Sequence, residues 1–301
     1  MALVENVLLA DFDLAPAKVL LFDSQQISRR KTREALAEVG LRAIREASTI
    51  RELQLSLNER QHDLLMVASS HADDGIAKLL HGLRHHRFGV DPFAPMVATI
   101  GSKDDRLVQS IAFSGVDHIV GKPFSGNQIL RRLDALICRR QRFVQTLDYL
   151  GPDRRKPGSR DAQDEAIDVP NALRARVDRR ADCAPSAAAI AAAKAGLARL
   201  RMRNIGRRIG AAIREMRRVD PVEVNRNGWE TQFAALCRCL DALADPNDGG
   251  GDAVANACAG LRQAALRVRS VDGDGWNQAH DAVMARAKVL LDVLRKAASA
   301  R

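Results

Sequence analysis

Aromatic residues are scarce in this sequence. Phe, Trp and Tyr together make up 4% of the 301 residues, so aliphatic side chains must fill any core. The five cysteines form no CxxC pair and no zinc-like spacing, so the usual signatures of a structural zinc site or a redox motif are missing. We therefore expect reduced thiols, no metal site and no bound cofactor.

Long apolar runs are also lacking. No run approaches the roughly 18 residues that a membrane-spanning helix requires. Residues 1–16 carry acids and no basic start, unlike a secretory signal. We expect a cytoplasmic protein with no transmembrane segment, in which residues 1–16 are an N-terminal extension.

Charge is unevenly distributed along the chain. The net charge is +10, and residues 139–218 hold 20 Lys and Arg against nine Asp and Glu, so the remainder is close to neutral. Within this block, residues 151–159 contain Gly-Pro and Pro-Gly steps and no apolar periodicity. These features predict a basic flexible linker over residues 145–185.

Short apolar runs alternate with helical patterns over residues 17–144. Continuous apolar runs are typical of strands in a parallel sheet that is covered on both faces. The alternation predicts a flavodoxin-like α/β domain with strand order 2-1-3-4-5, whose ligands bind beyond the carboxyl ends of the strands. The predicted strands are 18–22, 41–45, 63–68, 95–100 and 117–121.

Residues 186–301 have only helical patterns. Ser186 is a good N-cap before an alanine-rich run, and Pro, Asp and Gly residues at 245–251 interrupt the pattern. Each helix is apolar on one side, so the helices must bury these stripes together. We expect an all-α helical bundle.

Several motifs of the α/β region resemble CheY-like receiver domains of response regulators. They are LFDSQQISRR around the first strand, HDLLMVASSHADDG around the third, and IVGKPF around the fifth. The runs FGVDPFAPMVATIG and RFVQTLDYLGPDRRK further resemble alphaproteobacterial receivers with a DYxGPDRR-like extension. The resemblance covers residues 17–144 and implies a two-component signalling function.

The resemblance also assigns the receiver's phosphorylation site, residue by residue. Asp23 matches one of two metal-binding acids, and Ser24 replaces the other. Ala68 stands at the phosphate-accepting aspartate, and Ile100 at the switch hydroxyl. Lys122 is retained. A methyl group cannot accept a phosphoryl group, and one carboxylate is too little for Mg²⁺, so we expect a degenerate site without phosphorylation.

Three further expectations concern this site. Lys122 should pair with Asp23 across the strand ends, and the bond before Pro123 should be cis, as the resemblance implies. A one-residue slip of the alignment puts Val67 or Ser69 at the acceptor position, and neither is an aspartate. The alternative acceptors Asp73 and Asp74 lie in the loop after the third strand, where acids also serve as helix N-terminal residues.

Two surfaces are candidates for binding. The resemblance implies pairing through the fourth helix, fifth strand and fifth helix. We expect its apolar contacts to come from among Leu107, Ile111, Ile119, Ile129 and Leu133, some of which must be core residues. The Arg-rich helix at 199–218 can bind an acidic protein, nucleic acid or an anionic membrane. Its candidate residues are Arg207, Arg208 and Arg214.

Histidines offer two further alternatives. His81 and His85 share an i, i+4 face that can bind zinc, but no third ligand is adjacent in sequence. His280 lies on a bundle helix but lacks the following Lys that phosphotransfer domains carry. We therefore expect both sets to be surface histidines.

The sequence favours a binding protein and not an enzyme. The predicted function is phosphorylation-independent signal transduction, in which a pseudo-receiver and a C-terminal helical region bind protein partners. A kinase or another signalling protein is one such partner, and a second copy of the chain is another. The alternative is a nucleic-acid-binding regulator that uses helix 199–218.

Overall fold

The computed structural model describes residues 12–102, 104–155, 166–218, 226–243, 251–269 and 274–299. Most of the predicted N-terminal extension, residues 1–11, lies outside this set. The chain divides into two compact units at residue 194, and residues 145–148 belong to the second unit. Apart from these four residues, the second unit begins within the helix that spans Ala187–Arg218.

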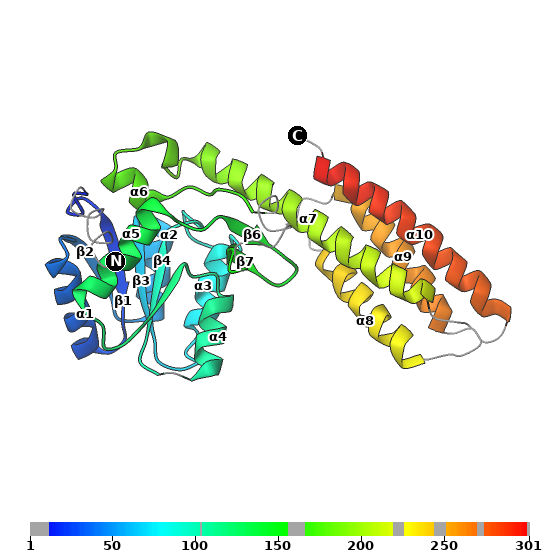
Figure 1. Cartoon of the computed structure of the whole chain (residues 1–301), viewed down its shortest axis with the longest axis horizontal. Coiled ribbons are helices and arrows are strands. Elements are labelled where there is room, and N and C mark those ends of the chain that lie inside the picture. Colours follow the sequence, from blue (N-terminus) through cyan, green and yellow to red (C-terminus); the bar gives the residue numbers. More distant parts are fainter. Residues whose placement is uncertain are drawn as a thin grey trace, which may run out of the picture. The chain divides into compact units, whose positions relative to one another are not determined.

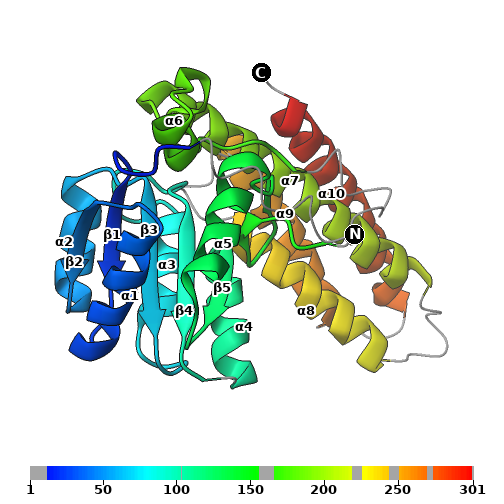
Figure 2. The same ribbon diagram turned by 60° about the vertical axis from the view of Figure 1, so that its left-hand side comes forward.

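The first unit is built on a five-stranded parallel sheet. Its order is β2-β1-β3-β4-β5, with every neighbouring pair in parallel register, which confirms the predicted topology (Figures 1 and 2). The central strand β3 is buried at every residue, as its continuous apolar sequence predicts. The strands are β1 (Lys18–Phe22), β2 (Ala43–Ala47), β3 (Leu64–Ser69), β4 (Met96–Ile100) and β5 (His118–Gly121).

Five helices cover the two faces of this sheet. They are α1 (Gln26–Glu38), α2 (Ile50–Glu59), α3 (Ile76–Arg84), α4 (Asp105–Phe113) and α5 (Gly126–Cys138). Alternate residues of each strand point to opposite faces. Leu65 and Val67 of β3 pack with α2, α3 and α4, whereas Leu64 and Met66 pack with α1 and α5. The result is a three-layer α/β/α arrangement (Figure 2).

Capping side chains fix where two of these helices begin. Thr49 accepts a hydrogen bond from the backbone N–H of Glu52, and the Glu52 carboxylate accepts one from the N–H of Thr49. Ser125 and Gln128 form the same reciprocal pair at the start of α5. Such capping boxes satisfy N–H groups that would otherwise lack partners at a helix end.

The chain continues from α5 with ordered elements in the segment that the sequence indicates as a linker. These are β6 (Phe143–Gln145), β7 (Leu150–Pro152), α6 (Ala172–Val177) and the 3-10 helix η2 (Ala181–Cys183). Phe143 is fully buried and bridges to Ile167, and Leu173 joins the core beneath α1 and α5. The few apolar residues of this polar stretch therefore anchor its described parts to the first unit.

A buried ion cluster ties this extension to the sheet. Arg84, at the end of α3, has no exposed side-chain surface and donates to Asp117 at 2.9 Å. Arg140, just after α5, donates to both Asp117 oxygens at 2.7 and 3.2 Å. Both guanidinium groups also lie 5.0 Å from the ring centroid of Phe143. One carboxylate thus joins α3, the start of β5 and the extension.

Backbone acceptors complete this cluster. Arg84 donates to the carbonyl groups of Gly115, Pro92 and Ala94 as well as to Asp117, so four of its five N–H donors are hydrogen-bonded. Burial alone would raise the pKa of Asp117, but Arg140 and Arg84 outweigh it and hold that pKa below its usual value. The cluster is therefore ionised at neutral pH.

Two glycines let the extension approach the sheet closely. Gly115 has φ of +85°, and a Cβ there would lie 2.3 Å from the carbonyl oxygen of Leu150. A Cβ on Gly151 would lie 2.7 Å from the Cα of Gly115. Any side chain at either position would push β7 away from the α4–β5 turn.

His86 is a non-glycine residue with a positive φ. It has φ of 59° directly after α3, and its ring packs edge-on against Phe93. Its Nδ1 is buried without a hydrogen-bond partner among the described residues. Burial, helped by the nearby Lys194 charge, lowers the pKa of His86 to about 3, because the charged form cannot be solvated there.

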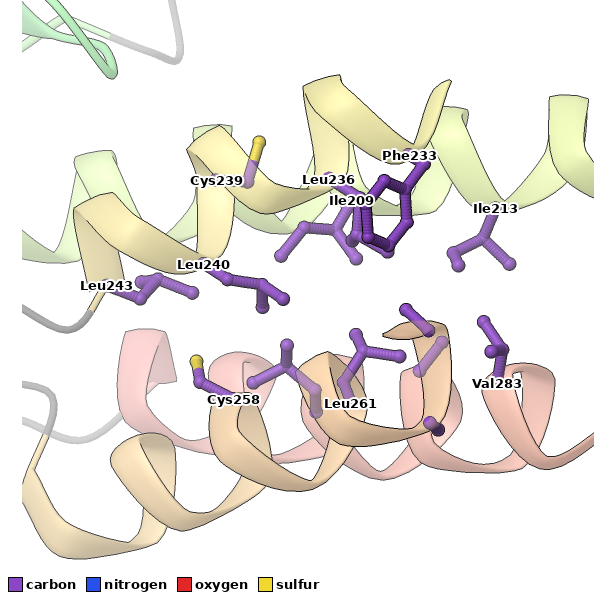
Figure 3. Packing of buried hydrophobic residues seen from close by; sticks show 14 of the residues in the cluster. Ile209, Ile213, Phe233, Leu236, Cys239, Leu240, Leu243, Cys258, Leu261 and Val283 are labelled. Atoms are coloured by element: carbon purple, nitrogen blue, oxygen red, sulfur yellow. The ribbon is translucent and has the colours of Figure 1, made fainter. Parts of the chain in front are cut away.

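The second unit is an all-α bundle, as predicted. It contains the greater part of α7 (Ala187–Arg218), with α8 (Arg226–Leu243), α9 (Gly251–Arg269) and α10 (Asp274–Ser299). The side chain of Ser186 accepts a hydrogen bond from the N–H of Ala189, which confirms the predicted N-cap of α7. Figure 3 shows apolar side chains of the four helices meeting in one core, which includes Ile209, Leu236, Leu240 and Leu261.

No helix in the described part of the chain is long and apolar enough to cross a membrane.

The ion cluster predicts a large effect of Asp117→Asn. The change leaves the buried Arg84 charge without its counter-ion, so we expect the free energy of unfolding to fall by about 3–5 kcal/mol. Urea denaturation followed by circular dichroism measures this. The matched control is Asp182→Asn, which removes an exposed ion pair with Arg180 and should have a much smaller effect on the free energy of unfolding. Equal losses would mean that the cluster is not a key contact.

His86 predicts a pH dependence of stability. Its pKa is lower in the folded state, so the unfolded chain binds the extra proton and stability falls as pH drops below about 6.5. Between pH 7 and pH 5 we expect His86 to account for a loss of up to about 2 kcal/mol. His86→Asn, which tolerates a positive φ, should flatten this slope, whereas the exposed His71→Asn should not. An unchanged slope in the His86 variant would contradict the assignment.

Candidate functional site

The carboxyl ends of the five strands form the edge at which ligands bind in this topology. Asp23 directly follows β1, Ala68 is the penultimate residue of β3, and Ile100 ends β4. Lys122 directly follows β5, and the Lys122–Pro123 bond is cis, as predicted. The fold therefore brings these residues of the predicted site to one edge of the sheet.

Asp23 and Lys122 form an ion pair across this edge, as predicted. The Lys122 Nζ lies 2.7 Å from Asp23 Oδ2, and the Asp23 side chain is 3% exposed. The other carboxylate oxygen accepts the backbone N–H of Gln25 at 2.9 Å. The retained acid and the retained base thus neutralise each other.

Two residues of the first turns of α1 complete the pair, and the sequence did not single them out. Ser28 Oγ accepts a second hydrogen bond from Lys122 Nζ at 2.7 Å. Arg29 donates to the carbonyl oxygen of Asp23 at 2.7 Å and pairs with Glu46 of β2 at 3.0 Å. The only available signal was their position on the helix that follows β1.

Ala68 occupies the end of the central strand, where the resemblance implies the phosphate acceptor. It is 7% exposed and lies opposite Thr99 in the β3–β4 register. Thr99 is 1% exposed and Ile100 is 6% exposed, so neither presents a hydroxyl to the solvent side of this edge. Ser24 is exposed. This edge offers no nucleophilic carboxylate on β3.

Asp74, the alternative acceptor, is used by its own loop. Its Oδ2 accepts from Ser69 Oγ at 2.7 Å and from the N–H of Ser70 at 2.8 Å. Its Oδ1 accepts from the N–H of Ile76 at 3.0 Å. These bonds hold the β3–α3 loop and occupy the first N–H group of α3. Asp74 thus lies at the helix N-terminus, which is the alternative role that the sequence suggested. Asp73 is exposed.

Metal binding requires several oxygen or nitrogen ligands at one place. Within the described ranges, no three His, Cys, Asp or Glu residues lie close enough together to hold a metal ion. At the strand edge, Asp23 is the carboxylate that matches the receiver pattern, and it is engaged with Lys122. The arrangement supports charge neutralisation within the protein and not recruitment of a cation.

The predicted interaction face on α4, β5 and α5 needs a correction. Leu107 and Ile111 are at most 1% exposed and pack in the core beneath α4, and Ile129 and Leu133 are equally buried beneath α5. These four side chains hold the helices on the sheet and cannot contact a partner. They are buried because the apolar stripe of an amphipathic helix faces the core. Of the five candidates, only Ile119, on β5, is partly exposed.

A hollow of about 310 Å³ lies beside Ile119. It is lined also by Gln128, Arg131 and Arg132 of α5, and Arg131 is exposed. His118, at the start of β5, is half-buried, and burial lowers its pKa. This face is therefore basic at its rim and apolar at one point.

The histidine alternatives lie elsewhere. The rings of His81 and His85 lie 4.0 Å apart on α3, and both are half-buried where the sequence predicted a surface face. His280 on α10 is half-buried too, and not solvent-facing as predicted. Partial burial in the bundle follows from its place between the apolar residues of α10.

The arginines of α7 point in several directions. Arg207, Arg208 and Arg214 are exposed, as a binding role requires. Arg208 faces Asp148 at 4.0 Å, and Arg201 donates to the carbonyl oxygen of Ala242 on α8. Arg201 and Arg208 are therefore engaged on another side of α7 than Arg203, Arg207 and Arg214.

The Asp23–Lys122 pair predicts that the two residues depend on each other. Lys122→Met leaves the buried Asp23 carboxylate without its cation, so the free energy of unfolding should fall by about 1–3 kcal/mol. The double variant Asp23→Asn/Lys122→Met should lose less than the single variant, because no buried charge remains. Chemical denaturation measures both. Additive losses from the two single changes would contradict the coupling.

Comparison with known proteins gives matches among solved structures only. Neither the protein-family descriptions nor the curated proteins give a match. One structure is a signal receiver domain of a two-component histidine kinase from Clostridium thermocellum, with 14% identity and a TM-score of 0.34 over 40% of this chain and 95% of that one. A CheY-like response regulator from Mesorhizobium loti has 16% identity and a TM-score of 0.32 over 39% and 95%.

A third match is the chemotaxis protein CheY4 of Vibrio cholerae, with 19% identity and a TM-score of 0.34 over 40% of this chain and 97% of that one. At these identities the matches concern the fold alone. The strand order, the parallel register and the cis-proline turn after β5 are seen in this structure without reference to the matches. The N-terminal unit of this chain has a flavodoxin-like α/β fold with strand order 2-1-3-4-5.

Proposed function

We propose that this chain is a signalling protein whose receiver-like unit acts by binding and without phosphorylation. The observation that carries the proposal is Ala68 at the end of β3, where the receiver pattern has its acceptor aspartate. The Asp23–Lys122 pair supports it, because the cation that would neutralise a phosphoryl group is already neutralised. The unit is then a binding module and not an enzyme.

Protein partners fit the exposed features of the receiver-like unit. The hollow beside Ile119 combines an apolar residue with a basic rim, a mixture that suits an acidic protein surface. Phe113 at the end of α4 is 63% exposed and packs edge-on against Tyr149. Exposed aromatic side chains of this kind are common anchors at protein interfaces. A kinase, another signalling protein or a second copy of the chain is such a partner.

The alternative of a nucleic-acid-binding regulator is supported by the exposed arginines of α7. Binding to phosphate backbones releases counter-ions and weakens steeply with salt. Arg201 and Arg208 have partners within the chain, so fewer arginines of α7 are left to contact a phosphate backbone, which makes this alternative less favoured. Salt-sensitive retention on DNA or RNA decides between the two functions.

Phosphodonor treatment tests the proposal directly. Incubation of the full chain with acetyl phosphate and Mg²⁺ should leave its intact mass unchanged, because Ala68 cannot accept a phosphoryl group. The matched variant Ser24→Asp/Ala68→Asp restores the receiver acids beside Lys122 and should gain about 80 Da per phosphoryl group. Mass spectrometry measures both.

Two outcomes bear on the alternatives. An adduct on the unaltered chain would overturn phosphorylation independence. If that adduct disappeared in Asp74→Asn, the loop carboxylate would be the acceptor in spite of its hydrogen bonds to Ser69 and Ser70. If it persisted, peptide mapping after treatment would locate the acceptor elsewhere in the chain.

A further inference from the structure

A groove of about 490 Å³ runs between α7 and α10 within the helical unit. Its volume lies in the range of roughly 300–1,000 Å³ that small-molecule sites occupy. The proposed signalling role does not use it.

Two glycines of α7 open this groove. Gly206 and Gly210 are one helical turn apart and both line it. A Cβ on Gly206 would make an ordinary contact of 3.8 Å with Leu294, and one on Gly210 would meet the Arg214 guanidinium at 3.6 Å. Alanine would therefore fit at both positions. Each glycine costs a helix interior about 0.5–1 kcal/mol, so the fold itself does not call for them.

Four arginines surround the groove. Arg203, Arg207 and Arg214 come from α7, and Arg295 comes from α10. All four side chains are exposed, and the described residues that line the groove include no Asp or Glu. Arg295 is paired with Asp292 at 3.3 Å, in a contact that is itself largely exposed and worth little. The groove is therefore a concentrated positive site.

The floor of the groove is apolar. Met202 and Leu294 are at most 5% exposed, and Leu291 is partly exposed beside them. The thioether of methionine makes favourable contacts with aromatic rings, and guanidinium groups both stack on planar rings and bind phosphate oxygens in pairs. The site therefore combines a surface for a flat apolar body with a rim for several negative charges.

We propose that this groove binds a small organic polyphosphate with an aromatic body, of the nucleoside polyphosphate class. The phosphates lie against Arg203, Arg207 and Arg295, and the ring lies over Met202 and the glycine turn. The ligand joins the first and last helices of the bundle, and its binding stabilises the helical unit.

A small ligand fits better than a nucleic-acid strand. The groove is confined to one side of α7, whereas Arg201 and Arg208 turn toward α8 and Asp148. A strand would need basic residues that continue beyond the ends of the groove.

Isothermal titration of the full chain with ATP tests the proposal. Tripolyphosphate and adenosine are the comparison ligands. ATP should bind with a micromolar Kd, tripolyphosphate about tenfold more weakly, and adenosine at least about 100-fold more weakly. Equal affinity for ATP and tripolyphosphate would remove the aromatic part of the proposal. No heat with ATP would overturn it.

Paired variants locate the site. Arg203→Gln/Arg295→Gln removes two charges from the rim and should weaken ATP binding at least about tenfold. The matched control Arg217→Gln/Arg238→Gln removes two exposed charges of the same unit that do not line the groove, and it should change the affinity less than about twofold. Equal weakening in both variants would overturn the site.

Filling the groove without unfolding the bundle gives a second test. Gly206→Ala/Gly210→Ala improves helix propensity, so thermal stability should be kept or raised while ATP affinity falls. Unchanged affinity would contradict the role of the glycines. A short single-stranded oligonucleotide that binds more tightly than ATP, and equally to all variants, would replace the proposal with nucleic-acid binding.

Discussion

A single buried carboxylate, Asp117, holds the first unit together. It lies between the guanidinium groups of Arg84 and Arg140, which come from elements on either side of β5 in the chain. Burying three charged groups is costly, and it is tolerated only because backbone carbonyls accept the remaining N–H donors. The receiver-like sheet consequently forms one compact unit with Arg140 and Phe143, which follow α5.

The edge formed by the carboxyl ends of the strands differs from this cluster. There Asp23 is paired with Lys122, and the Asp74 carboxylate accepts hydrogen bonds from hydroxyl and N–H donors of its loop. Under the proposed function, an edge whose carboxylates already have partners gathers neither a cation nor a phosphoryl group. Recognition is then left to the side chains on the outer faces of the helices.

The sequence predicted the sheet because its strands are continuous apolar runs, and β3 is buried at every residue. It predicted the Asp23–Lys122 pair because the resemblance fixed both positions. Leu107 and Ile111 were expected among candidates for a pairing face, but both are buried in the core. A helical pattern shows which residues are apolar, and it does not show whether their apolar side faces the core or a partner. The sequence also missed Ser28, whose role depends on where α1 passes the strand ends.

The segment after α5 shows why composition can mislead. The Arg, Gly and Pro residues of 145–185 indicate a solvated linker, yet Arg154 donates to the carbonyl oxygen of Val116 and Asn171 to that of Leu136, which no local pattern reveals. The groove of the bundle is a comparable case. In the sequence, Gly206 and Gly210 only lower the helix propensity of α7. Their place in a groove becomes visible only when α10 packs beside them.

The close approach of Gly115 to Leu150 and Gly151 sets a practical limit on how this protein can be divided. A chain cut after α5 would lose Arg140 and Phe143 and would uncover one side of a guanidinium group that is otherwise sealed from water. The smallest autonomous receiver-like fragment is therefore longer than its sheet and five helices indicate. Fusion or domain exchange with other proteins has to carry the tail along.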